Sequence, residues 1–250
     1  MLTPARHEII LEQLERYQTV KIQDLVNETG ASESTIRRDL SQLENANKLK
    51  RVHGGASCLH QTSEELSIRE KSDQNLNEKV AIAKEAASLI RDGDCIFLDA
   101  GTTTYQMIPF LKGRNLTVVT NGVTLLEELT ENQVPTYLTG GFVKHKTRAL
   151  IGRGATHSLQ QYRFDKCFLG VNGVHPSHGY TTPDPEEALV KQTVLTLSQE
   201  AFVLGDASKL NELSFSSIAS LQDATLITNE NDPERLSPYQ EKTNVKVVSS

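Results

Sequence analysis

The sequence predicts an α/β protein in two parts: a small helical domain at the N-terminus, then a larger domain built on a mainly parallel sheet. Within residues 1–56 the apolar side chains recur at helical spacing. From residue 78 onward, short apolar runs alternate with helical stretches, which is typical of a parallel sheet with helices on its faces. The 250 residues are 37% hydrophobic, which is enough to form a core in each part.

Three helices are expected in the N-terminal part. The first reaches about Tyr17. The second is short, spans about residues 21–28 and is broken near Gly30, which is free to take a positive φ. The third begins after Ser32, whose hydroxyl can cap it, and reaches about Asn45.

The third helix has two contrasting faces. Ile36, Leu40 and Leu43 form its buried stripe. Hydroxyl, amide and guanidinium groups lie on the opposite face and its flank. A helix-turn-helix has this arrangement, because one face packs on the preceding helices while the other enters the major groove. The residues expected to contact DNA from this helix are Ser34, Thr35, Arg37, Arg38 and Ser41.

A basic wing is expected after the third helix. Lys50, Arg51 and His53 precede a Gly54-Gly55 turn, and a short strand returning from such a turn can lie against phosphates. Residues 34–55 hold five basic and two acidic side chains, although residues 1–56 as a whole are neutral. The alternative is a three-helix bundle with a solvated basic face. The combination of glycine turn, serine cap, arginine pair and basic wing favours a winged helix-turn-helix that binds double-stranded DNA.

Composition excludes several other classes of protein. No window approaches 18 consecutive apolar residues, so no spanning helix is expected, and the start of the chain lacks a long apolar segment typical of secretion. The three cysteines are far apart and form no metal-binding pattern. We therefore expect a cytoplasmic protein without a metal or membrane partner. The formal charge of -6 belongs entirely to the chain beyond residue 56.

The polar segment 57–77 is expected to be a linker, and the larger domain is expected over 78–250. Its first helix contains the apolar positions between residues 80 and 90. The expected strands are the apolar runs at 95–98, 117–120, 136–138, 167–171, 201–204 and 224–227. The expected helices between them include 123–131, 155–161 and 186–197.

Small and polar residues follow nearly every expected strand. Ligands of parallel sheets bind at the carboxyl ends of strands, and a glycine followed by three threonines at a helix start suits phosphate. Together these ends predict a roomy pocket for a polyol phosphate, in which Thr and Lys bind phosphate and Asp and Asn bind hydroxyls. The expected ligand-binding residues are Asp99, Gly101, Thr102, Thr103, Thr104, Asn121, Gly140, Gly141, Lys144, Arg148, Asn172, Glu187, Lys191, Asp206 and Lys209.

Some of these residues have a plain structural alternative. Lys144 and Arg148 form either a mobile phosphate clamp or a solvated loop. Glu187 belongs to a capping box begun by Asp184, and Lys191 can pair with Glu187 one helical turn away. The segment 152–154 lacks the third glycine and the strand of a dinucleotide-binding turn, so no cofactor is expected.

Several of these segments resemble the DeoR family of bacterial transcriptional regulators. Residues 31–40 (ASESTIRRDL) and 51–56 (RVHGGA) resemble its DNA-binding signature. Its effector domain resembles the segments 98–104, 119–121, 140–141, 165–173 and 206–209. The resemblance implies a fold similar to ribose-5-phosphate isomerase and the CoA-transferases, and a phosphorylated sugar as effector.

A narrower resemblance concerns segments 141–147, 179–189 and 241–248, which are similar to fructose-operon repressors of Gram-positive bacteria. That resemblance implies fructose 1-phosphate as the effector. The leading hypothesis is therefore a repressor of a sugar-utilisation operon, released from its operator by a phosphorylated sugar. Because the small domain contacts few base pairs, a homodimer or homotetramer is expected.

Other functions stay open at this stage. A repressor responding to another ketose phosphate, such as tagatose 6-phosphate, fits the same residues. A sugar-phosphate isomerase with an attached DNA-binding module is also possible, since Asp99, Asp165, Asp206 and Lys209 include possible acid–base groups. No nucleophile–base pair is visible, so we expect no catalytic residues and no enzyme. An architectural DNA-binding protein without a ligand would leave the polar strand ends unexplained.

Overall fold

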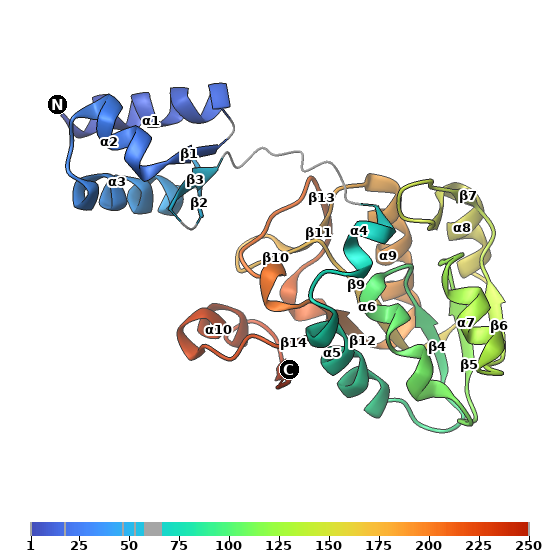
Figure 1. Cartoon of the computed structure of the whole chain (residues 1–250). Helices are drawn as coiled ribbons and strands as arrows, with labels where there is room; N and C mark the ends of the chain where they lie inside the picture. The colour runs from blue at the N-terminus through green and yellow to red at the C-terminus, as the bar shows by residue number, and fades with distance from the viewer. Residues whose placement is uncertain (1, 18, 47, 53, 58–66, 250) are drawn as a thin grey trace. The chain divides into compact units, whose positions relative to one another are not determined.

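The computed structural model describes residues 2–17, 19–46, 48–52, 54–57 and 67–249. The chain divides into two compact units, residues 1–64 and 65–250 (Figure 1). The linker expected over 57–77 overlaps both units, because Ser57 ends a strand of the first and the helix Ile68–Ser72 belongs to the second. His53 lies outside the described residues.

The first unit confirms the three expected helices and the wing. The helices are α1 (Thr3–Tyr17), α2 (Ile22–Thr29) and α3 (Glu33–Asn45). The strands β1 (Thr19–Lys21), β2 (Lys50–Val52) and β3 (Gly55–Ser57) form an antiparallel sheet in the order β1-β3-β2. Strand β1 was not expected, since three residues give too short a pattern to identify. The buried stripe of α3 packs in the core with Ile10, Leu14 and Leu25 of α1 and α2.

Two glycines fix the turns of this unit. Gly30 has φ 65°, and its N–H donates to the carbonyl oxygen of Val26 at 2.9 Å, which ends α2. A Cβ on Gly55 would lie 1.9 Å from the carbonyl oxygen of Val20, so only glycine allows β3 to approach β1 this closely.

The second unit is built on a seven-stranded sheet in which all six strand pairings are parallel. In spatial order the strands are β15 (Val245–Val247), β14 (Thr225–Thr228), β12 (Ser198–Leu204), β9 (Phe164–Gly170), β4 (Cys95–Leu98), β5 (Thr117–Thr120) and β6 (Thr136–Leu138). The six expected strands are confirmed. The seventh, β15, was not predicted, because three residues (Val-Lys-Val) give too short an apolar pattern to identify.

Helices cover both faces of the sheet (Figure 1). Phe97 of β4 packs into one core cluster and its neighbours Ile96 and Leu98 into another, so alternate side chains of one strand are buried on opposite faces. The helices of this unit are α4 (Ile68–Ser72), α5 (Leu76–Ser88), α6 (Thr102–Tyr105), α7 (Leu125–Glu131), α8 (Gly152–Leu159), α9 (Pro185–Leu197) and α10 (Pro233–Gln240). The 3₁₀ helices are η1 (Ile108–Leu111), η2 (Ala207–Lys209) and η3 (Leu221–Asp223).

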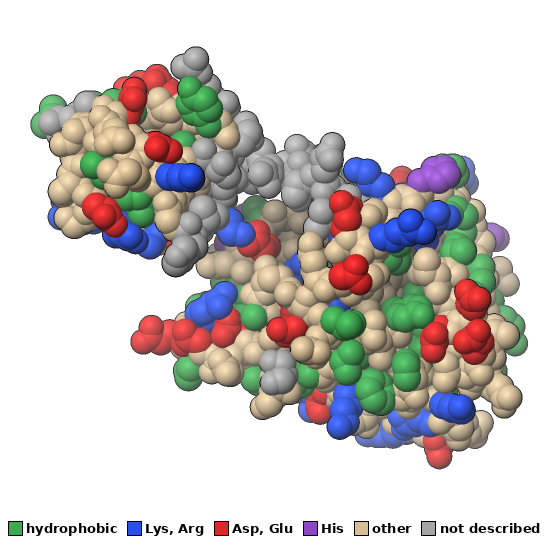
Figure 2. Space-filling model, in the orientation of Figure 1, with side chains coloured by type: hydrophobic (Ala, Val, Ile, Leu, Met, Phe, Trp, Pro, Cys, Tyr) green, Lys and Arg blue, Asp and Glu red, His purple; other side chains and the backbone are tan. Residues whose placement is uncertain are grey.

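Two small sheets complete the second unit. One contains β10 (Gly173–His175), β11 (Gly179–Thr182) and β13 (Ser216–Ala219), and the other is the hairpin of β7 (Phe142–Val143) and β8 (Leu150–Ile151). On the face of this unit seen in Figure 2, acidic and basic side chains are interspersed. Among the described residues, no helix combines the length and apolar character needed to cross a membrane.

Candidate functional site

The outward face of α3 is the candidate DNA-contacting surface. Ser34 and Arg38 are exposed on it, and Ser32 caps the helix by accepting from the N–H of Thr35 at 3.3 Å. Arg37 is exposed but paired, since its Nη2 lies 2.6 Å from Oε1 of Glu33 one turn earlier. The expected polar face is therefore present, with Arg38 rather than Arg37 as its more available cation.

The wing is joined to α3 by hydrogen bonds. Arg51 donates from Nη1 to the hydroxyl of Ser41 at 2.7 Å, and its backbone N–H donates to Glu44 at 2.8 Å. Ser41 also donates to the carbonyl oxygen of Arg37 at 2.9 Å. Ser41 and Arg51, both expected to contact DNA, thus bind each other and fix the wing beside the helix. Lys50 is half-buried in β2.

A buried ion pair anchors α3 from behind. Asp39 is 1% exposed, and Arg6 of α1 donates to both of its carboxylate oxygens, at 2.7 and 3.0 Å. Burial alone would raise the pKa of Asp39, but the hydrogen bonds and charge of Arg6, with a smaller contribution from His7, hold that pKa below its ordinary value. Sequence reasoning missed this pair, because partners 33 positions apart leave no local pattern.

In the second unit, β4 lies between β5 and β9. The chain proceeds from β4 outward to β5 and β6 and then returns to the other side of β4 at β9. The strand order reverses there, so the carboxyl ends of β4 and β9 form the topological switch point at which open α/β sheets bind ligands. Asp99 follows β4 directly, and Gly170 ends β9.

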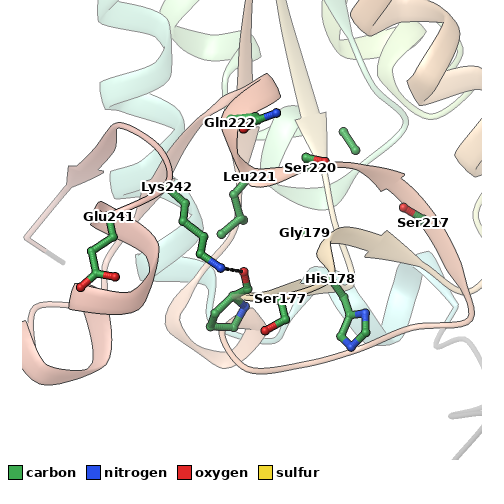
Figure 3. A pocket seen from close by; sticks show the side chains of 11 residues that line it. Ser177, His178, Gly179, Ser217, Ser220, Leu221, Gln222, Glu241 and Lys242 are labelled. Carbon is green, nitrogen blue, oxygen red and sulfur yellow. Dashed lines mark hydrogen bonds between the residues drawn. The ribbon is translucent and has the colours of Figure 1, made fainter.

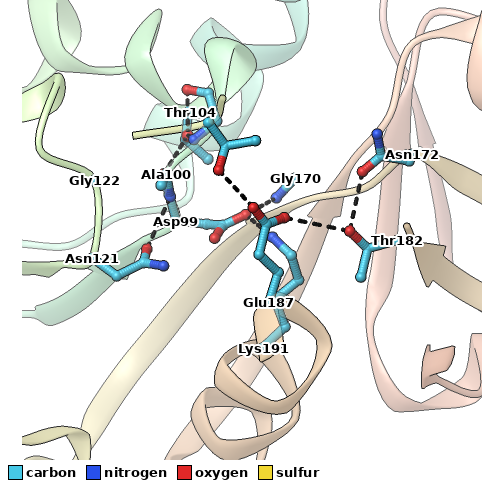
Figure 4. Close-up of polar contacts among 12 residues, drawn as sticks. Asp99, Ala100, Thr104, Asn121, Gly122, Gly170, Asn172, Thr182, Glu187 and Lys191 are labelled. Carbon is cyan, nitrogen blue, oxygen red and sulfur yellow. Dashed lines mark hydrogen bonds and ion pairs between the residues drawn. The ribbon is translucent and has the colours of Figure 1, made fainter. Parts of the chain in front are cut away.

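Asp99 joins three elements at this point (Figure 4). Its Oδ2 accepts from the backbone N–H of Gly170 at 3.0 Å and from Nζ of Lys191 on α9. Asp99 and Lys191 are 2% and 5% exposed. The structural alternative, in which Lys191 pairs with Glu187 on the helix face, is wrong. Both residues lie on α9, but Lys191 binds the strand end and Glu187 binds a different segment.

Glu187 holds the hairpin loop between β7 and β8. Its Oε1 accepts from the hydroxyl of Thr147 at 2.7 Å and from Nζ of Lys144 at 3.2 Å. Lys144 also lies 2.8 Å from Asp184, the cap residue of α9. Burial tends to raise the pKa of Asp184, but Lys144 and backbone N–H donors outweigh it and lower that pKa. Lys144 is thus not a solvated loop residue, because it is paired with two carboxylates, and its role as a mobile phosphate clamp stays a prediction.

Several expected ligand-binding residues have structural roles. Asn121 accepts from the N–H of Ala100 at 3.0 Å and donates to the carbonyl oxygen of Leu150 at 3.3 Å, so it ties three segments together. Thr104 donates to the carbonyl oxygen of Asp99 at 2.6 Å and accepts from the N–H of Gly101 at 3.1 Å. Thr103 is also buried, whereas Thr102 is half-buried at the start of α6.

The remaining expected residues lie around this centre. Asn172 accepts from the hydroxyl of Thr182 at 3.2 Å, and Lys209 is half-buried beside Asp206. Gly140 is exposed, and Gly141 has φ 128° where it packs against α8. Arg148 was expected at the site, but it is exposed at a left-handed position with φ 57°, and its N–H closes the hairpin turn on Lys144 at 2.8 Å.

At the strand ends the charged side chains expected to line a roomy pocket are buried, and the pocket itself stays a prediction. Asp99, Glu187, Lys191 and Asp206 are each at most 7% exposed, because their polar groups pair with one another or with neighbouring segments. A ligand entering here must separate some of these pairs. Sequence reasoning did not include Thr147 or Asp184 in the site, and neither carries a signal beyond its place in a loop or a cap.

A concavity of about 510 Å³ lies elsewhere in this unit, between the small sheet of β10, β11 and β13 and the segment after α10 (Figure 3). His178, Ser220 and Lys242 line it. Lys242 donates to the carbonyl oxygen of Pro176 at 2.8 Å. None of the described buried polar atoms that lack a hydrogen-bond partner belongs to its lining residues.

Comparison with known proteins decides the family. Residues 6–62 match the DeoR-like helix-turn-helix domain, and residues 74–230 match the DeoR C terminal sensor domain. The chain belongs to the DeoR family. Within it, the chain is 53% identical over 249 residues to the uncharacterized HTH-type transcriptional regulator FruR of Bacillus subtilis, covering 99% of each chain.

Two further similarities concern a curated repressor and a solved structure. The DeoR-family chain is 35% identical to the lactose phosphotransferase system repressor of Staphylococcus epidermidis, over 87% of this chain and 88% of that protein. It is also similar to ribose 5-phosphate isomerase A of Methanocaldococcus jannaschii, with 21% identity, a TM-score of 0.42 and coverage of 54% and 55% of the two chains. The two relatives that match over most of their length are named as a transcriptional regulator and a repressor.

Proposed function

We propose that this protein is a transcriptional repressor of a sugar-utilisation operon, released from operator DNA when a phosphorylated sugar binds at the strand ends of its second unit. The observation that carries the proposal is the pairing of Asp99 with Lys191 at the switch point of a DeoR sensor domain. A buried carboxylate and ammonium at that position offer an acceptor for sugar hydroxyls and a cation for phosphate.

The DNA contacts in this proposal come from α3 and the wing. Arg38, Ser34 and Thr35 are assigned to the groove, and Lys50 to phosphates. Arg37 must exchange Glu33 for DNA, and Arg51 acts while bound to Ser41. His53 of the wing is assigned to phosphates on sequence grounds alone. Because one such unit contacts few base pairs, the repressor is expected to bind paired half-sites as a homodimer or homotetramer.

The ligand contacts divide by chemistry. Lysine ammonium groups and the threonines at the start of α6 are assigned to the phosphate: Lys144, Lys191, Lys209, Thr102 and Thr103. Carboxylate and amide groups are assigned to sugar hydroxyls: Asp99, Asn172, Glu187 and Asp206. Since most of these groups are paired in the structure, binding requires a rearrangement, and a rearrangement is what differential affinity between two states needs.

The specific effector proposed is fructose 1-phosphate. The support is the 53% identity to FruR and the resemblance of segments 141–147 and 179–189 to fructose-operon repressors. Tagatose 6-phosphate is the second candidate, because another ketose phosphate offers the same hydroxyl and phosphate groups to these residues.

The test is titration of the purified protein onto its own promoter DNA, with and without each of five compounds: fructose 1-phosphate, fructose 6-phosphate, fructose 1,6-bisphosphate, tagatose 6-phosphate and fructose. Thermal unfolding against the same panel measures binding directly. A ligand at 100 times its Kd stabilises the native state by about 2.7 kcal/mol. Release and stabilisation by fructose 1-phosphate alone support the proposal. Unchanged operator affinity with every phosphate would sink the effector model.

A further inference from the structure

Helix α4 is the first helix of the second unit, and it starts a few residues after the division between the units at residue 64. Ser67 caps it in a full capping box with Glu70, whose carboxylate accepts from the N–H of Ser67 at 2.8 Å. A helix of five residues is too short to be stable alone, so its position depends on what holds its two ends.

The N-terminal end of α4 is held by the loop between β7 and β8. This loop belongs to the ligand site proposed at the strand ends of the second unit, called the strand-end site below. The N–H of Ile68 donates to the carbonyl oxygen of Lys146 at 3.0 Å. Lys146 lies between Lys144 and Thr147, whose side chains both bind Glu187. The same loop therefore contacts both Glu187 and the first turn of α4.

The connection from α4 to α5 is held by Asp206, which follows β12. Asn75 joins α4 to α5 in the left-handed conformation, with φ 52°, and its Nδ2 donates to Oδ1 of Asp206 at 3.1 Å. Lys79 donates to the carbonyl oxygen of Lys71 in the last turn of α4. The ammonium of Lys79 is buried, which lowers its pKa, and the nearby charge of Asp206 opposes that shift.

Helix α4 also packs against α6, which begins with Thr102 (Figure 1). Three segments assigned to the ligand thus contact α4 or its connection to α5: the hairpin loop, the threonine helix and the Asp206 turn. Oδ1 of Asp206 already accepts from Asn75 and from the N–H of Ser208, and its residue is 3% exposed. A sugar hydroxyl that binds this carboxylate competes most directly with Asn75, because Asn75 is exposed.

We propose that α4 couples occupancy of the strand-end site to the chain leading to the winged helix: it is docked through Ile68 and Asn75 in the operator-binding state and is released when a sugar phosphate takes Asp206 and moves the hairpin loop. The proposal rests on the proposed function, since it names how that site acts on DNA binding. It assigns Asn75 as a positioning residue, acting through Asp206 rather than by contact with DNA.

The test compares Asn75→Asp with Asn75→Gly and with the matched control Asn77→Asp, in the full chain. Aspartate at 75 keeps the side-chain shape and the left-handed conformation but replaces the donor with a second carboxylate facing Asp206. Glycine keeps the conformation and removes the amide. Asn77 is exposed two residues later on α5, so its substitution adds the same charge without touching Asp206.

Operator affinity is measured first without any sugar phosphate. The two Asn75 variants are expected to bind operator about 5-fold more weakly than the control or worse, the lower end of ordinary coupling factors. Their affinity for fructose 1-phosphate, followed by thermal unfolding, is expected to equal or exceed that of the wild type. A variant damaged in folding would instead lose both affinities.

Two results overturn the proposal. Operator affinity of both Asn75 variants equal to that of Asn77→Asp would show that the docking of α4 does not matter for DNA binding. The ratio of operator affinities measured without and with fructose 1-phosphate is the second readout. If this ratio is the same in the Asn75 variants as in the wild type, the coupling does not pass through α4. If the wild type itself ignores every phosphate, the proposed function fails, and the operator affinities without ligand still decide whether α4 controls DNA binding.

Discussion

Lys191 donates to the carboxylate of Asp99 from 92 positions further along the chain, and neither side chain is more than a few per cent exposed. The pair joins α9 to the end of β4 where the strand order reverses. A buried ion pair at a switch point contributes little net stability compared with apolar side chains of similar size, but losing one partner leaves a buried charge. The switch-point position is the reason for which we propose that this pair binds the ligand.

Lys191→Met is expected to destabilise the protein by about 3 kcal/mol, because Asp99 is left charged and buried without its cation. Urea unfolding of the full chain measures the change. In the double variant Asp99→Asn, Lys191→Met neither charge remains, so most of the stability should return while the response to sugar phosphate is lost. If Lys191→Met alone were as stable as the wild type, solvent or another cation would have to reach Asp99.

Arg38→Ala is expected to weaken operator binding by about 1–3 kcal/mol, the usual range for one arginine contact. Arg37→Ala should cost less, because Arg37 must first leave Glu33, 2.6 Å away. The measurement is operator titration at several salt concentrations, since a lost phosphate contact also lowers the salt dependence. Arg163→Ala, an exposed arginine of the second unit, is the control. Equal losses at positions 37 and 38 would contradict the ranking.

Two alanine substitutions in the wing test whether its backbone requires glycine. Gly55→Ala places a Cβ within 1.9 Å of the carbonyl oxygen of Val20, so β3 must separate from β1. Gly54→Ala meets no neighbouring atom within 4 Å and suffers only the left-handed penalty at φ 81°, about 1–2 kcal/mol. We expect Gly55→Ala to abolish operator binding and Gly54→Ala to reduce it. Hydrogen exchange of the β1 and β3 amides reports whether the two strands have separated, which is expected for Gly55→Ala and not for Gly54→Ala.

The fold could be predicted largely from sequence because its signals are local. Ile36, Leu40 and Leu43 recur at helical spacing and are buried, and the apolar run at 95–98 forms β4 between two parallel neighbours. The strand ends could be located for the same reason, since each follows a recognisable apolar run. These signals need only a few adjacent residues.

The pairing within the site could not be predicted in the same way. Helical spacing indicates Glu187 with Lys191, but tertiary partners override it: Asp99 takes the lysine and Thr147 binds the glutamate. A surface pair of this kind is stabilised by only about 0.2–0.5 kcal/mol, less than a buried, charge-assisted hydrogen bond. Asn75 gives no sequence signal, because its partner Asp206 is 131 positions away.

Acid should lower the stability of the first unit by protonating Asp39. Its pKa is held below the ordinary 3.8 in the folded protein, so its contribution to stability is fully present above that pH and is lost as the pH falls through the lower, folded value. Hydrogen exchange of the α3 amides across pH 5 to about pH 2.5 should show this loss. Asp39→Asn should flatten the profile, whereas Asp24→Asn, exposed in α2, should leave it unchanged. An identical profile for Asp39→Asn would contradict the assignment.

Lys144 is expected to bind the phosphate once it leaves its two carboxylates. Its Nζ lies 2.8 Å from Asp184 and 3.2 Å from Glu187, and its side chain is 16% exposed, so a phosphate at the strand ends offers it a third anionic partner within reach. Lys144→Met should weaken fructose 1-phosphate binding roughly tenfold, the value of one charge-assisted hydrogen bond. Thermal unfolding with increasing ligand measures the loss. Lys112→Met, exposed beyond η1, is the matched control. Undiminished binding by Lys144→Met would assign this lysine to holding α9 and the hairpin together, and would leave Lys191 and Lys209 as the phosphate cations.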